Sequence, residues 1–171
     1  MKLKTKEMIL FSLLGATMFV SKLITEALPN IHLLGLFIVS YTVVFRAKAL
    51  IPIYVFVFLT GIYGGFTFWW VPYLYIWSVL WGAVMLLPKD MPKRMSTPLY
   101  MVVSGLFGLL YGVLYAPAQA IMFGYDLDKT LAWIAAGFYF DITHGISNFL
   151  VASLTPALVT VLKRGVRSIR Q

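Results

Sequence analysis

The sequence predicts an all-α integral membrane protein with six transmembrane helices and both termini in the cytoplasm. Hydrophobic residues make up 61% of its 171 residues, and the mean hydropathy is +0.88. A soluble domain this apolar could not cover its surface with polar groups. In a bilayer every backbone N–H and C=O must be paired internally, which helices achieve. The ten-residue alternation typical of a membrane β-barrel is absent from the sequence.

Six apolar stretches form a single domain over residues 1–171, with no linker or soluble module between them. They are Met8–Leu28, Ile31–Phe45, Leu50–Tyr63, Phe66–Leu87, Leu99–Phe123 and Leu131–Leu162. A helix needs about 20 residues to cross the hydrocarbon. The second and third stretches are shorter, so we expect either short helices deep in the bundle or a partly irregular outer segment.

Turn-forming residues mark the connections between these stretches. Pro29 and Asn30 break the chain after the first helix, and Gly64 lies in a flexible turn between the third and fourth. The last stretch is too long for one span. We therefore expect an outer, aromatic segment over Leu131–Tyr139 and an inward helix from Asp141. Pro156 would either kink that helix or mark a close approach to a neighbouring helix.

The distribution of positive charge predicts the orientation. All but two of the 14 Lys and Arg residues lie before the first stretch, between the second and third, between the fourth and fifth, or after the sixth. Only Lys22 and Lys129 fall on the other side. Short loops rich in Lys and Arg stay in the cytoplasm, so both termini are predicted inside. The basic composition therefore reports topology and is not an indication of nucleic-acid binding.

The N-terminal basic residues and apolar run could alternatively be a signal peptide. The run is long for that purpose and no small-residue cleavage site follows it, which favours a retained helix. The chain has no cysteine, which excludes disulfides, thiolate metal sites and thiol nucleophiles. We expect no cofactor and no metal.

A polar face in the last stretch is the sharpest local signal. Asp141, His144 and Asn148 are spaced i, i+3 and i+7, which places them on one side of a helix, while Thr143 lies off that face. Ionisable groups at membrane depth usually face a cavity or a partner. The alternative is an interfacial helix start, with Asp141 as a cap and His144 solvated.

Two further stripes approach the outer side. Tyr111, Tyr115 and Gln119 share a face of the fifth stretch, and the fourth carries Trp70, Tyr73, Trp77 and Trp81 at helical spacing. Aromatic belts at the membrane surface explain Trp70. The deeper Trp77 suits either packing within the bundle or the wall of a pocket that stacks a planar ligand.

Ser12, Gly15 and Ala16 give the first helix a small-residue face, which allows close helix approach in lipid. This face is either a contact within the bundle or a docking surface for another membrane subunit. Motifs of common hydrolases, zinc proteases and P-loop ATPases are absent from the sequence. The buried coupling carboxylates and internal repeat of many secondary transporters are also missing.

The length, the six predicted helices, the cytoplasmic termini and two local patterns together resemble the substrate-binding S component of energy-coupling factor (ECF) vitamin transporters. The likeness covers nearly the whole chain and includes two local patterns. Ser12 to Ala16 is similar to the family's Ala-x-x-x-Ala docking motif, with serine in the first position, and Phe140 to Asn148 looks like the start of the family's sixth helix. The resemblance implies a multi-pass protein of a prokaryotic cell membrane that is not an enzyme.

The resemblance also implies how the protein works. Its partners would be a membrane coupling subunit and two ATPase subunits, and it would topple in the membrane to deliver a captured vitamin. Helix one would dock, and the stripes of Tyr111, Asp141 and Asn148 would line the pocket. Overall similarity favours the group assigned to hydroxymethylpyrimidine, a thiamine precursor, with other vitamins still open. The alternatives are a small membrane enzyme that uses Asp141 and His144, and a ligand-free assembly subunit.

Overall fold

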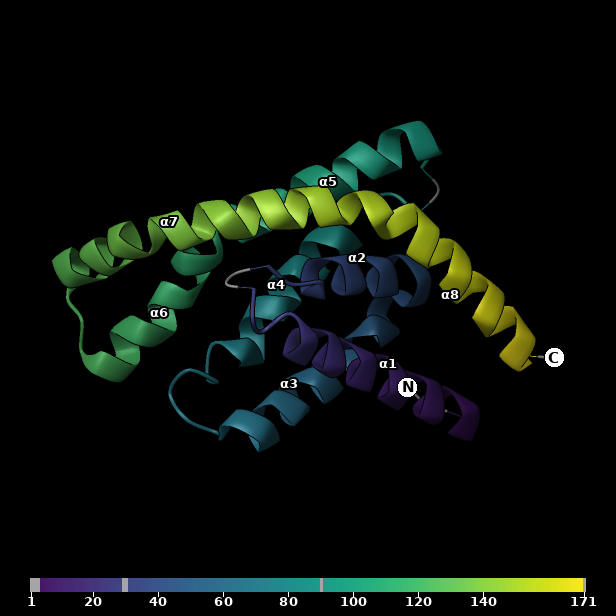
Figure 1. Ribbon diagram of the computed structural model, residues 1–171, viewed down its shortest axis with the longest axis horizontal. Helices are drawn as coiled ribbons and strands as arrows, with labels where there is room; N and C mark the ends of the chain where they lie inside the picture. Colours follow the sequence, from purple (N-terminus) through teal and green to yellow (C-terminus); the bar gives the residue numbers. More distant parts are fainter. Residues whose placement is uncertain (1–3, 29–30, 90, 171) are drawn as a thin grey trace.

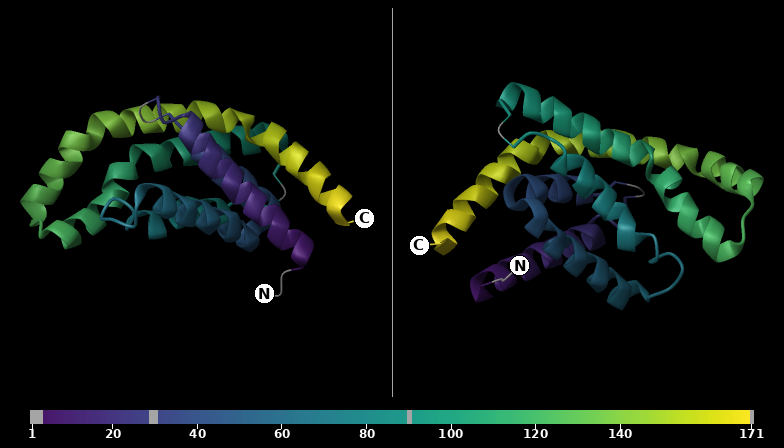
Figure 2. Two further views of the ribbon diagram at one scale, coloured as in Figure 1. Left: turned by 60° about the horizontal axis from the view of Figure 1, so that its bottom comes forward. Right: turned by 180° about the vertical axis from the view of Figure 1, so that it is seen from behind.

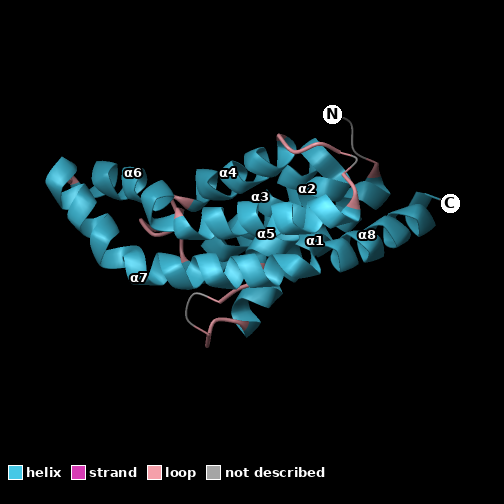
Figure 3. Cartoon of the chain, turned by 90° about the horizontal axis from the view of Figure 1, so that it is seen from above, coloured by secondary structure: helices cyan, strands magenta, loops and turns pink. Residues whose placement is uncertain are grey.

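The computed structural model describes residues 4–28, 31–89 and 91–170, and that part of the chain is helical with no strand (Figures 1 and 3). The α-helices are α1 (Thr5–Ile24), α2 (Leu34–Phe45), α3 (Leu50–Gly64), α4 (Tyr73–Met85), α5 (Lys93–Leu109), α6 (Tyr111–Phe123), α7 (Leu127–Val151) and α8 (Thr155–Arg170). Two 3-10 segments, η1 (Arg46–Ala49) and η2 (Ala152–Leu154), join α2 to α3 and α7 to α8.

Four helical segments are long and apolar enough to cross a membrane. They are Thr5–Ile24, Leu34–Gly64, Arg94–Phe123 and Leu127–Arg167, and Tyr73–Met85 is a shorter apolar helix. The predicted all-helical class is therefore confirmed, and these segments fit a membrane protein by their length and composition. The second and third predicted stretches form short helices of 12 and 15 residues. This agrees with the expectation of short helices within the bundle.

The turn between α2 and α3 is fixed by contacts at one end of the molecule. Arg46 has a positive φ of 52°, a conformation that is costly for a non-glycine residue. Its guanidinium donates to the carbonyl of Met85 at 2.7 Å, and its own carbonyl accepts from Trp81 Nε1 at 3.1 Å. Lys48 forms an ion pair with Glu7 at 2.6 Å. The start of α1, this turn and the end of α4 therefore meet, and both termini lie at this end (Figure 1).

The fourth and fifth predicted stretches each differ from one continuous helix. In the fourth, residues 66–72 form turns and α4 begins only at Tyr73, after Pro72, which has no N–H to donate. In the fifth, the helix breaks at Leu110 into α5 and α6. The Gly112 N–H beyond this break donates to the Asp141 carboxylate at 2.9 Å, so a side chain from α7 supplies the acceptor.

The last stretch is also organised differently from its prediction. Leu131–Tyr139 is not a separate segment, because α7 runs unbroken from Leu127 to Val151. With α6 it forms a helical hairpin that reaches past the other helices at the end away from the termini (Figure 2). The predicted bend at Pro156 is present: η2 ends one residue before α8, and proline cannot donate to the carbonyl of Ala152.

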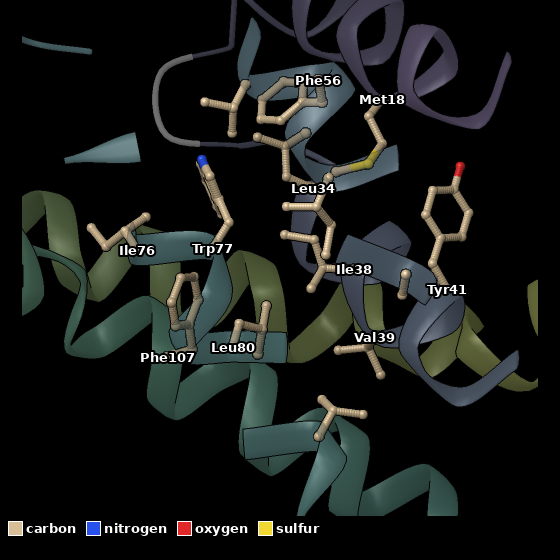
Figure 4. Packing of buried hydrophobic residues seen from close by; sticks show 14 of the residues in the cluster. Met18, Leu34, Ile38, Val39, Tyr41, Phe56, Ile76, Trp77, Leu80 and Phe107 are labelled. Carbon is tan, nitrogen blue, oxygen red and sulfur yellow. The ribbon is translucent and has the colours of Figure 1, made fainter. Parts of the chain in front are cut away.

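The largest buried side chains come from the first four helices and from α5. Met18, Ile38, Phe56, Trp77 and Phe107 belong to one core cluster (Figure 4). Helix α2 is the most enclosed, with eight buried residues in twelve. Trp77 lies at the border of this core, and its indole nitrogen points away from Leu80 and Phe107 (Figure 4).

Candidate ligand-binding site

A cavity of about 320 Å³ lies at the C-terminal end of α1, far from the first turn of that helix. It is bounded by the last turn of α1, the α1–α2 connection, the first residues of α4 and α6, and the middle of α7. The lining residues are Lys22, Thr25, Glu26, Leu28, Ile31, His32, Tyr73, Tyr111 and His144. Its volume falls at the lower end of the range for small-molecule sites.

Aromatic rings form the wall of this cavity. The ring of His144 lies 4.9 Å from Tyr111 and 5.2 Å from His32, measured between centroids. Behind them, Trp77 lies 5.2 Å from Tyr73 and 5.9 Å from Tyr111. Tyr73 and Tyr111 also share a side-chain hydrogen bond. Rings at these separations are in contact with one another and form one aromatic cluster beside the cavity.

Three buried nitrogens around the cavity have no hydrogen-bond partner among the described residues. They are His32 Nδ1, Trp77 Nε1 and His144 Nδ1; seven other buried side-chain atoms of the described residues also lack a partner, among them Asp141 Oδ2 and Gln119 Oε1. Each unpaired buried polar atom costs about 1–3 kcal/mol. An indole N–H only donates, whereas a neutral imidazole offers one donor and one acceptor. A ligand with hydrogen-bonding atoms in the plane of a ring would compensate this cost.

Charged groups of both signs line the same cavity. Lys22 and Glu26 come from the end of α1 and the residues just after it, one helical turn apart. His32, in the α1–α2 connection outside the spanning helices, stays neutral at pH 7. Burial lowers its pKa from 6.5 to about 4, with a smaller contribution from the neighbouring His144. The cavity can therefore take a ligand that is neutral or carries charges of both signs.

Close packing of α5 on α7 places His144 at the cavity. A Cβ on Gly108 would lie 2.6 Å from the His144 carbonyl, and a Cβ on Gly145 would lie 2.5 Å from Leu109. Only glycine fits at these two positions, so the backbones approach as small residues permit in lipid. Gly112 similarly abuts the Asp141 carboxylate.

The predicted site residues separate into two groups. Tyr73, Tyr111 and His144 line the cavity, and Trp77 supports it from behind. Trp70 and Tyr115 do not line it: Trp70 donates to the carbonyl of Val57 at 2.8 Å, and Tyr115 to that of Trp69 at 2.6 Å.

Three further predicted residues lie away from the cavity lining. Asp141 is buried and holds the N–H of Gly112. Asn148 is buried beside α2, where a Cβ on Gly35 would lie 3.0 Å from its Oδ1. Gln119 is on α6, beyond the lining residues of that helix.

The small-residue face of α1 also divides. Gly15 is buried against α3, where its Cβ would lie 2.6 Å from Val55, so this position serves packing within the bundle. Ser12 is exposed and Ala16 is partly exposed. These two residues are available at the surface of the chain.

The N-terminal third also contributes to the cavity, although the sequence pattern places the predicted site residues only in the later helices. His32 had one available signal: it is one of only two histidines in the chain. The charge pattern places Lys22 on the outer side, but it does not predict that Lys22 lines the cavity. Comparison with protein-family models, curated proteins and solved structures found no match.

Proposed function

We propose that this protein is the substrate-binding S component of an ECF-type importer in a prokaryotic cell membrane. In this proposal it has six membrane-crossing segments with both termini inside, and it captures a small vitamin or vitamin precursor from outside. It is not an enzyme. The observation that carries the proposal is the aromatic cavity of about 320 Å³ with three unpartnered nitrogens around it.

The position of the cavity supports capture from outside. The first turn of α1 contacts the Arg46 turn through the Glu7–Lys48 ion pair, whereas the other end of α1 lines the cavity. Most of the basic residues lie in the loops and terminal segments on the side of the Arg46 turn. If those loops are cytoplasmic, as their charge predicts, the cavity belongs to the outer half of the membrane.

The chemistry of the cavity favours a small aromatic heterocycle. Tyr111 and His144 offer ring faces, and His32 offers ring nitrogens, among the residues that line the cavity. Hydroxymethylpyrimidine, the candidate from the family resemblance, is flat and has ring nitrogens and an exocyclic amine. It is the first ligand to test.

Mass spectrometry of small molecules released from the purified protein tests the proposal without a prior choice of ligand. We expect one heterocycle per chain. Calorimetry with hydroxymethylpyrimidine then tests its identity, and loss of a hydrogen bond in His144→Phe should weaken binding roughly tenfold. A ligand that binds wild type and His144→Phe equally would remove this cavity from the proposal.

The proposed partners are a membrane coupling subunit and two ATPase subunits, which should co-purify with the chain. Ser12→Trp and Ala16→Trp should block uptake while leaving ligand binding intact, because both positions reach the surface of α1. Leu13→Trp, at an exposed position off this face, is the matched control. Equal uptake in all three variants would refute docking through Ser12 and Ala16.

A membrane enzyme that uses Asp141 and His144 is less well supported. The Asp141 carboxylate accepts from Gly112, whereas His144 contacts the rings of Tyr111 and His32. The two side chains thus have different neighbours, which does not suit an acid–base pair.

A further inference from the structure

The two histidines of the chain meet in the cavity. His32 and His144 are the only histidines in 171 residues and are far apart in the sequence. In the fold their rings lie 5.2 Å apart, inclined at 45°. The Nδ1 atoms of both are buried without a hydrogen-bond partner among the described residues. This convergence needs an explanation beyond aromatic packing, for which phenylalanine would suffice.

The separation of the two rings suits a shared metal ion. Imidazole nitrogens bind Zn²⁺ at roughly 2.0–2.1 Å, so two imidazoles on one tetrahedral ion have ring centres roughly 5 Å apart. Imidazole nitrogen is a preferred ligand of Zn²⁺, Cu²⁺ and Ni²⁺. It binds these ions when unprotonated, and burial favours that form of His32 because its pKa is about 4.

We infer that His32 and His144 form a two-histidine site for a borderline divalent transition metal ion, at the wall of the cavity that both residues line. No group of three or more His, Cys, Asp or Glu side chains suited to a metal exists within the described part of the chain. The protein therefore supplies two ligands, and the remaining coordination positions are open to water or to a nitrogen- or oxygen-bearing small molecule in the cavity.

The charges around the cavity permit a cation. Lys22 opposes a positive ion and Glu26 favours it, and both residues line the same space. Removal of the Lys22 charge should therefore tighten metal binding. This effect distinguishes a site in the cavity from adventitious binding elsewhere on the chain, which Lys22 would not influence.

The test uses metal alone. The full chain, purified without a polyhistidine tag and stripped with a chelator, is titrated with Cu²⁺ and Ni²⁺ by calorimetry. We expect one ion per chain, at least tenfold weaker binding in His32→Phe and in His144→Phe, and no binding in the double variant. Lys22→Met should bind more tightly than wild type. Phenylalanine keeps a ring at each position, and thermal melting confirms that the variants are folded.

Electron paramagnetic resonance of the Cu²⁺ form identifies the ligands directly. We expect nitrogen couplings from two imidazoles in wild type and from one in each single variant. If either phenylalanine variant unfolds, His→Gln replaces it. Wild-type affinity weaker than ~1 mM, or binding unchanged in the double variant, would overturn the inference. Since no organic ligand is present, that failure would leave the proposed capture of a heterocycle intact.

Discussion

Trp70 and Trp77 belong to the same aromatic stripe, yet the hydrogen bonding of their indole N–H groups differs. Trp70 Nε1 donates to the carbonyl of Val57 at 2.8 Å, whereas Trp77 Nε1 is buried without a partner among the described residues. Asp141 and His144, one helical turn apart on α7, differ in part. Asp141 Oδ1 accepts from the Gly112 N–H while its Oδ2 has no partner among the described residues, and His144, which lines the cavity, has an unpartnered Nδ1.

This contrast distinguishes side chains that build the scaffold from side chains that are available to a ligand. A polar atom with an internal partner contributes mainly to folding, and its loss should reduce stability. A polar atom that lacks one is already a cost to folding. Its loss should leave stability unchanged or raise it, and should reduce affinity. Substitutions of residues with and without an internal partner should therefore differ in their effects on stability.

Asp141→Leu should have the largest effect. It removes the acceptor of the Gly112 N–H at the α5–α6 break and leaves that donor buried. A hydrogen bond to a charged group contributes about 1.5–3 kcal/mol, so we expect a loss of this size in thermal or denaturant unfolding in detergent. Asp141→Asn keeps an acceptor oxygen and should lose less. If Asp141→Leu unfolded like wild type, the scaffold role of Asp141 would be wrong.

Trp70→Phe and Trp77→Phe should have smaller and opposite consequences. Trp70→Phe leaves the carbonyl of Val57 without its donor and should cost roughly 1 kcal/mol of stability, with ligand affinity unchanged. Trp77→Phe removes an unsatisfied donor behind the cavity wall, so stability should hold or rise slightly. Calorimetry and melting of both variants provide the cross-check. Equal changes in stability for Trp70→Phe and Trp77→Phe would contradict the distinction between partnered and unpartnered indole N–H groups.

The smallest effect should come from the protonation of His32. Its pKa is about 4 in the fold and 6.5 when solvated, so the unfolded chain binds the proton more readily. Stability should therefore fall as the pH drops from about 6.5 toward 4. Melting of metal-free protein over this range should show a shallower slope in His32→Phe than in wild type. Parallel slopes would contradict burial of His32.

Much of the fold could be predicted from the sequence, because hydropathy reports directly on length and burial in lipid. The short α2 and α3 and the bend at Pro156 follow from such local signals. The break at Leu110 does not, since its stabilising acceptor, Asp141, is far along the chain and is apposed only through the glycines of α5 and α7.

The candidate site was harder to predict for a similar reason. Helical spacing correctly placed Asp141, His144 and Asn148 on one side of α7, but that side packs against different neighbours at each level. Only His144 lines the cavity. Periodicity could not reveal that the connection after α1 brings His32, with Lys22 and Glu26 nearby, to the same place.

Cysteine accessibility is the most direct test of whether the cavity opens to the outside of the cell, as proposed. The chain has no native cysteine, so single cysteines can be placed at Glu26, beside the cavity, and at Arg94, at the start of α5. In intact cells an impermeant thiol reagent should label Glu26→Cys and leave Arg94→Cys unlabelled until the membrane is opened. Labelling of Arg94→Cys alone would reverse the orientation and contradict capture from outside.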